Sequence, residues 1–214
     1  MSLFDAPLHH NLSQASIHRA SYDLRNIYHE SLIRVKPDLA VTFVDNHDTQ
    51  PLQSLEEFTE QWFKPHAYAL ILLRKEGYPC VFYADLYGAR YSGKNKDGVD
   101  CDIELPPLGN LPALLELRKN YAYGEQEDYF DDPNCVGWVR KGSADRPGSG
   151  FAALLCNHSS CGSVKKMLVG ADKAMKHYYD FLGNEKGTIT VDEEGYGYFP
   201  VGPSSVSVWV IKNE

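Results

Sequence analysis

The residues best able to do chemistry form one polar cluster, Asp45-Asn46-His47-Asp48, which directly follows an apolar run at residues 39–44. A carboxylate there can stabilise a developing positive charge or keep a neighbouring acid protonated. An imidazole beside it can donate a hydrogen bond to a substrate hydroxyl. Two other interpretations stay open on spacing alone. The cluster could be a polar turn that caps the next element, or a His-Asp metal site like that of a metal-dependent phosphohydrolase, although no further ligands cluster around it.

Such a cluster needs a strand that ends at it, and the surrounding pattern predicts one. Residues 39–44 are apolar on both faces, which is typical of a buried parallel strand. A helical pattern follows over 58–76, where Pro65 is expected to kink or interrupt the helix. The alternation of strand and helix predicts a parallel sheet with its site at the carboxyl ends of the strands. Other elements expected in this half are a short strand within 2–8, a helical segment within 11–31, a strand at 80–83, a hydrophilic loop at 90–102 and a helix at 111–119.

The pattern changes near residues 121–124. Short strand-like segments separated by Gly, Asn, Asp and Pro follow, at 136–140, 151–156, 166–169, 188–191 and 206–211. They predict an all-β module appended to the α/β part. We therefore place two domains at residues 1–122 and 123–214.

Composition restricts the class of partner. The formal net charge of −8 and the pI near 5.5 describe a surface that repels phosphate backbones, so nucleic acid is not expected as a partner. No apolar stretch is long enough to span a membrane, and no obligate protein partner is evident. The five cysteines contain no Cys-x-x-Cys pair, which favours free thiols in a reducing compartment. Because residues 1–11 also lack a signal-peptide pattern, a cytoplasmic location is expected.

Residues 43–51, Phe-Val-Asp-Asn-His-Asp-Thr-Gln-Pro, resemble the strand-seven motif of α-amylases in glycoside hydrolase family 13. The resemblance continues upstream and downstream, at residues 4–9, 62–65, 67–74, 77–83, 118–124, 128–130 and 136–138. It is strongest to the liquefying bacterial and intracellular fungal α-amylases. The resemblance implies the C-terminal part of a (β/α)₈ TIM barrel, about strands 6–8, followed by an antiparallel β-sandwich domain.

The same resemblance implies endo-hydrolysis of α-1,4-glucosidic bonds in starch-type or glycogen-type glucans, with retention of configuration. Asp48 matches the third catalytic carboxylate, and His47, Gln50 and Asp85 match substrate-binding positions. The motifs that carry the nucleophile and the general acid do not occur in these 214 residues, so the chain alone is expected to be inactive. The alternative is a non-catalytic carbohydrate-binding or modulating remnant of the same fold. In either case the expected partner is an α-glucan polysaccharide.

Liquefying relatives can hold a calcium ion between the barrel and the C-terminal domain. Tyr22 matches a position that supplies a backbone carbonyl, whereas Asn134 and Asn157 stand where carboxylates are expected. Neutral amides supply oxygen without charge, which lowers calcium affinity. Calcium is therefore implied for the complete family enzyme, but we expect none to be bound by this chain and assign no metal ligand.

Overall fold

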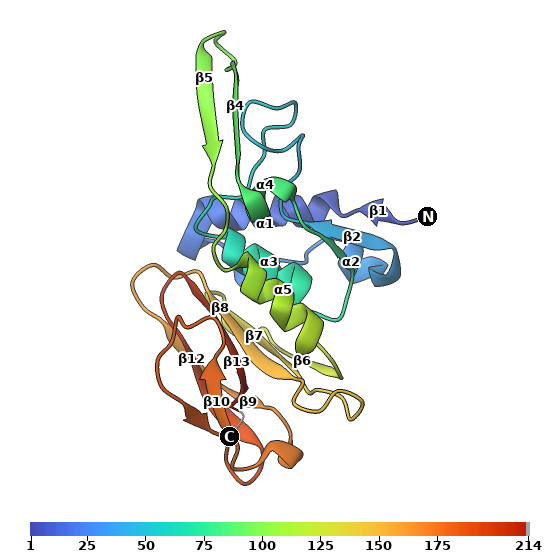
Figure 1. The fold of residues 1–214 in the computed structure, drawn as a ribbon, viewed down its shortest axis with the longest axis vertical. Helices are drawn as coiled ribbons and strands as arrows, with labels where there is room; N and C mark the ends of the chain where they lie inside the picture. The colour runs from blue at the N-terminus through green and yellow to red at the C-terminus, as the bar shows by residue number, and fades with distance from the viewer. Residues whose placement is uncertain (213–214) are drawn as a thin grey trace.

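The computed structural model describes residues 1–212. In the first half of the chain three short strands pair in parallel in the order β1-β2-β3, and helices pack against them (Figure 1). The predicted parallel sheet, with residues 40–43 as its middle strand, is confirmed. The elements of this half are β1 (Leu3–Phe4), α1 (Ala6–His18), α2 (Leu32–Val35), β2 (Ala40–Phe43), α3 (Lys64–Leu72), β3 (Tyr78–Cys80), α4 (Tyr83–Tyr87), β4 (Ala89–Lys94), β5 (Asp100–Leu105) and α5 (Leu111–Asn120), with 3-10 turns at Arg19–Ser21, Leu24–Asn26 and Pro37–Leu39.

Helix α1 begins earlier than the sequence pattern indicated. The Asp5 carboxylate accepts a hydrogen bond from the Leu8 amide at 3.1 Å, and Pro7 lies in the first turn, where its missing N–H costs nothing. Asp5 is fully buried, and its carboxylate also accepts hydrogen bonds from the amides of Leu32 (2.9 Å) and Ile33 (2.7 Å), which offset the cost of burying it. One carboxylate thus joins the start of α1 to the start of α2.

Helix α3 is shorter than predicted and is not kinked. Pro65 lies in its first turn, so it helps to start the helix instead of interrupting it. Eight of its nine residues are buried, because α3 packs against β3, α5 and strand β13 (Ser205–Ile211) of the second half. Although α3 is almost entirely buried, no helix within residues 1–212 is long and apolar enough to cross a membrane.

Two predictions between residues 78 and 105 are wrong. The strand expected at 80–83 is displaced toward the N-terminus: β3 ends at Cys80 and helix α4 begins at Tyr83, so Cys80 is the only residue of that range in a strand. The expected hydrophilic loop is a projecting antiparallel hairpin of β4 and β5 (Figure 1). Its half-buried and exposed residues alternate, and the turn is closed by Gly98 at φ 78° and by Asn95, whose side chain accepts two backbone amides. The polar residues belong to its exposed face, which is why the segment resembled a loop.

The second half is antiparallel. Six strands pair in the order β11-β10-β13-β8-β7-β6, and β12 pairs with β9. Every strand predicted here is present within a few residues, but β6, β10 and β12 were missed. The bounds are β6 (Gln126–Tyr129), β7 (Cys135–Arg140), β8 (Phe151–Cys156), β9 (Ser163–Leu168), β10 (His177–Asp180), β11 (Ile189–Thr190), β12 (Tyr196–Val201) and β13 (Ser205–Ile211), with a 3-10 turn at Ala171–Lys173.

The middle strands of the six-stranded sheet, β13, β8 and β7, are buried on both faces. Along β8, Ala153 and Leu155 pack toward the helices, while Ala152 and Leu154 pack toward the β9–β12 pair. This two-residue period produces two cores from one sheet. The first core is shared by α3 and the sheet, so the α/β part and the β part are joined by continuous apolar packing.

Candidate functional site

The polar cluster forms a tight turn at the carboxyl end of β2. The side-chain oxygen of Asn46 accepts the backbone amides of Asp48 at 2.8 Å and of Thr49 at 3.0 Å. The Thr49 hydroxyl in turn accepts the Asn46 amide at 3.0 Å. These bonds hold the backbone of the turn and leave the side chains of His47 and Asp48 free to point outward.

His47 and Asp48 are the accessible members of the cluster, with side chains 83% and 50% exposed. His47 Nε2 lies 3.5 Å from Asp48 Oδ1. The backbone carbonyl of Asp48 accepts the Leu55 amide at 3.0 Å, which ties the turn to the loop that follows. An exposed imidazole beside an exposed carboxylate can contact a polyhydroxyl ligand directly.

Gln50 lies apart from this pair, in a cleft of about 400 Å³. The side chains of His47 and Asp48 do not line that cleft. The structure therefore brings Gln50 together with Asp45 but places the exposed pair outside. The cleft is lined by Asp45, Gln50, Pro51, Phe58, Thr59, Glu60, Gln61, Lys64, Phe82, Asp102, Ile103, Glu104, Leu105 and Pro106.

Asp85 does not fit the expectation that it lines a substrate cleft. It is only 2% exposed, its Oδ1 pairs with the Lys64 ammonium, and its Oδ2 accepts the Tyr68 hydroxyl at 2.6 Å. The physical reason is the backbone: Asp85 lies within helix α4, where its side chain turns toward α3, instead of at the end of a strand.

Lys64 is the central charge of this buried network, a role that its place in the sequence did not indicate. Its ammonium also lies 2.9 Å from Asp45 Oδ2. Burial alone would lower the pKa of Lys64, but the two carboxylates raise it above its ordinary value. Burial raises the pKa of Asp45, against the attraction of Lys64. The sequence signal was a lysine at the start of a mostly apolar helix, since such a lysine must find carboxylates when it is buried.

The metal-site interpretation of the cluster lacks ligands. Within the part of the chain that the structure describes, no group of three or more His, Cys, Asp or Glu side chains is arranged to hold a metal ion. The residues that resemblance places near an interdomain calcium do not fit that ion either. The Asn157 side-chain nitrogen donates to the Tyr22 carbonyl at 2.9 Å, so an N–H group faces an oxygen that a cation would need.

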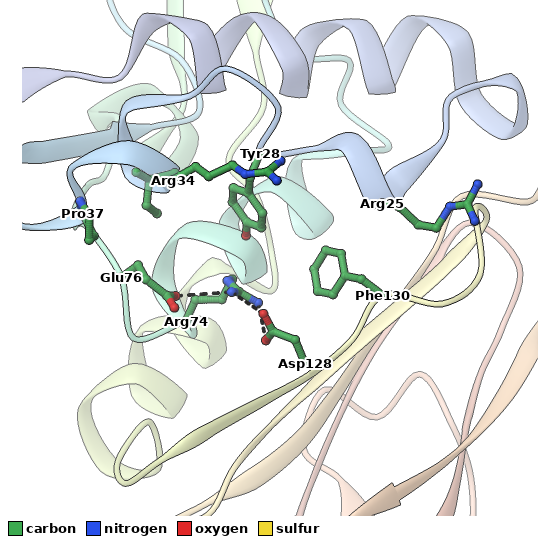
Figure 2. A pocket seen from close by; sticks show the side chains of 9 residues that line it. Arg25, Tyr28, Arg34, Pro37, Arg74, Glu76, Asp128 and Phe130 are labelled. Atoms are coloured by element: carbon green, nitrogen blue, oxygen red, sulfur yellow. Dashed lines mark hydrogen bonds and ion pairs between the residues drawn. The ribbon is translucent and has the colours of Figure 1, made fainter.

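A second cavity, of about 480 Å³, is organised around Arg74 (Figure 2). Its guanidinium donates two hydrogen bonds of 2.8 Å to the two carboxylate oxygens of Asp128, as Figure 2 shows. It also lies over the rings of Tyr28, Phe130 and Trp138, at 4.9, 5.4 and 5.8 Å from their centroids. The charge of Arg74 is therefore already paired and is not free for a ligand. Its contacts join the end of α3 to strand β6, so we interpret this cavity as part of the packing between these two elements.

The fold places the chain in a class of proteins in which a parallel α/β part is joined to an antiparallel β module. The exposed His47–Asp48 pair lies at a strand end of the α/β part. Residues 153–210 match the family "Alpha-amylase C-terminal". The chain is 46% identical to an α-amylase of Geobacillus stearothermophilus, over 98% of this chain and 36% of that protein. It is 43% identical to the cytoplasmic α-amylase of Escherichia coli (strain K12), over 98% of this chain and 42% of that protein. The resemblance to α-amylases is thereby confirmed.

A solved structure agrees at the level of the fold. The α-amylase of Geobacillus thermoleovorans, determined in complex with acarbose, aligns with 97% of this chain and 47% of its own, at a TM-score of 0.61 and 16% identity. The chain spans about two fifths of the length of the curated relatives it matches.

Proposed function

We propose that this chain forms part of an α-amylase that hydrolyses α-1,4-glucosidic bonds in starch-type or glycogen-type glucans with retention. The observation that carries the proposal is the exposed pair of His47 and Asp48 on a hydrogen-bonded turn at the carboxyl end of β2. Asp48 stabilises positive charge that develops on the sugar, and His47 donates a hydrogen bond to a sugar hydroxyl. The family resemblance of this segment supports both roles.

Retaining hydrolysis requires a nucleophile and a proton donor on either side of the bond. The motifs that carry them in the family do not occur in these 214 residues. We therefore propose that the parallel strands belong to a (β/α)₈ barrel as about strands 6–8, with a domain boundary near residues 122 and 123. On this proposal the chain alone releases no reducing ends from starch.

The test is an Asp48→Asn substitution in the complete parent protein. It preserves size and removes charge, so we expect kcat to fall at least about 100-fold, as when one transition-state contact is removed. Asp145→Asn, at an exposed loop position, is the matched control and should leave kcat unchanged. His47→Asn should reduce activity less than Asp48→Asn. An unimpaired Asp48→Asn parent, or robust hydrolysis by the isolated chain, would defeat the assignment.

A second candidate function is glucan binding without catalysis. Tyr83 and Tyr87 on α4 are 70% and 65% exposed, and their ring centroids lie 4.8 Å apart. Exposed aromatic faces of this kind can stack on the apolar faces of sugar rings. Retention of the chain on insoluble starch, lost in Tyr83→Ala/Tyr87→Ala and kept in the exposed-tyrosine control Tyr198→Ala, would favour binding.

For location, we propose the cytoplasm. One relative is named a cytoplasmic α-amylase, and all five cysteines of this chain are free thiols. The test is fractionation of the producing cells. Recovery of the protein in the medium instead of in the cytoplasmic fraction would contradict this location.

A further inference from the structure

Two asparagines stand side by side where the α/β part meets the β module. Asn134 precedes β7 and Asn157 follows β8, and their backbones are joined by the Asn157 amide, which donates to the Asn134 carbonyl at 3.1 Å. Their side chains are joined as well, since Asn134 Nδ2 donates to Asn157 Oδ1 at 2.9 Å. The two amides therefore form one unit at the end of the sheet.

Three backbone carbonyls from the turn after α1 converge on this unit. Asn157 Nδ2 donates to the carbonyl of Arg19 at 2.8 Å and to that of Tyr22 at 2.9 Å. Asn134 Nδ2 donates to the carbonyl of Ala20 at 2.8 Å. The turn is unusual in that Arg19 has a positive φ of 50°, so its carbonyl is directed by a conformation that an L residue seldom adopts.

Three carbonyl oxygens converge at this junction, and their partners are the N–H groups of the two amides. Asn157 is fully buried, and both N–H groups of each amide are used. A calcium ion needs six to eight oxygens at about 2.3–2.6 Å. Here the carbonyl oxygens face N–H donors instead. The nearby Asp132 carboxylate is directed to backbone, because its Oδ1 accepts the amides of Asn134 and Cys135 at 2.8 and 3.2 Å.

We propose that the Asn134–Asn157 amide pair takes the place of a calcium ion at this junction, so that the packing of the α1 turn against the β module is independent of calcium. The converse also holds. Replacing both amides by carboxylates removes the donors and directs two negative groups, together with three carbonyls, at one point. The Asn134→Asp/Asn157→Asp chain then requires a divalent cation to close the junction.

The test compares thermal unfolding in calcium and in EDTA for the wild type, the double Asp variant and a control. Asn11→Asp is a matched control. The side-chain nitrogen of Asn11 also donates to two backbone carbonyls, those of Ile27 at 3.1 Å and His29 at 2.8 Å, but within residues 1–212 Asn11 is not paired with a second asparagine. The quantity of interest is the calcium-induced shift of Tm relative to that of the wild type. This difference cancels the effect of any other calcium site in a longer parent protein.

We expect the double variant to gain a calcium-induced shift of about 5 °C or more at a concentration near 100 times its Kd, whereas Asn11→Asp gains none. It should also bind Tb³⁺ with luminescence sensitised by nearby tyrosine. A double variant that folds only when calcium is added supports the proposal equally. One that stays unfolded in saturating calcium, or folds without any added shift, overturns it.

A second test starts from the wild type and changes Asn157 alone. Asn157→Ala should lower Tm equally in calcium and in EDTA, because a hydrogen-bonded junction is lost and no ion is released. If instead the wild type loses a calcium-induced shift when Asn157 is changed to Ala, an ion is bound there and the proposal is wrong.

Discussion

We predict that the stability of the folded chain falls in acid because one buried histidine, His66, resists protonation. His66 on α3 is 1% exposed, its ring stacks on Phe63 at a centroid distance of 4.9 Å, and its Nε2 lies 3.0 Å from the Cys156 carbonyl of β8. Burial lowers the pKa of His66 from 6.5 to about 4. The neutral imidazole thus links α3 to the β module, and protonating it requires burying a charge.

The sign and the size of the effect follow from these two pKa values. Between pH 6.5 and 4 the unfolded chain binds a proton at His66 that the folded chain does not bind. Unfolding is therefore favoured progressively as the pH falls through this window, and stability is regained as the pH rises. The difference corresponds to about 3 kcal/mol of unfolding free energy at pH 4 and to almost none above pH 7.

Urea unfolding at a series of pH values between 4 and 8 measures this, with wild type and His66→Gln side by side. Glutamine keeps an N–H donor for the Cys156 carbonyl but does not titrate, so the variant should be less sensitive to acid even if it is less stable overall. The difference between the two curves should slope by about 1.1 kcal/mol per pH unit between pH 4.5 and 6 and be flat above 7. His177→Gln, at an exposed position on β10, should run parallel to the wild type. Parallel curves for His66→Gln and wild type would refute the reasoning.

Three further substitutions test the packing. Lys64→Met leaves two buried carboxylates without their cation and should cost about 3–5 kcal/mol in urea unfolding, whereas Lys75→Met, at an exposed position, should cost less than about 1 kcal/mol; equal effects would contradict a buried ion network. Tyr91→Phe removes the 2.5 Å hydrogen bond from the hairpin to the Pro51 carbonyl and should speed proteolysis of the loop after β2, with a stability loss of about 1 kcal/mol; unchanged cleavage would show that the hairpin does not hold that loop. Leu154→Ala opens a cavity between β8 and the β9–β12 pair and should lower the unfolding free energy by about 2–5 kcal/mol, and a loss below 1 kcal/mol would contradict its full burial.

Segments with strong local patterning were predicted well from the sequence. The apolar run at 39–44 became the middle parallel strand, the segment at 111–119 became α5, and residues 151–156 became β8 with the predicted bounds. The polar cluster after the first of these strands was likewise placed correctly at a strand end. In each of these segments the spacing of the hydrophobic residues along the chain indicates the conformation. An element that buries one or both faces must place its apolar side chains at the period of a helix or of a strand.

Errors arose where neighbouring structure overrode the local pattern. Pro65 starts α3 because the chain before it turns, which residue type alone does not reveal. The hairpin at 89–105 has enough polar residues to resemble a loop, and only its contact with the loop after β2 shows which face is covered.

The sequence alone predicted the parallel strand before the polar cluster, the helix at 111–119, the change from an α/β pattern to a β pattern, and the position of His47 and Asp48 at a strand end. Tertiary structure decided which polar groups meet. Lys64 joins the carboxylate of Asp45, which follows β2, to that of Asp85 on α4, so that Asp85 is buried although its position suggested a cleft. The amide of Asn157 reaches carbonyls 135 and 138 residues away. Such partners depend on how whole elements pack, since the cost of burying a charge or an amide is offset only by groups that packing brings within hydrogen-bond distance.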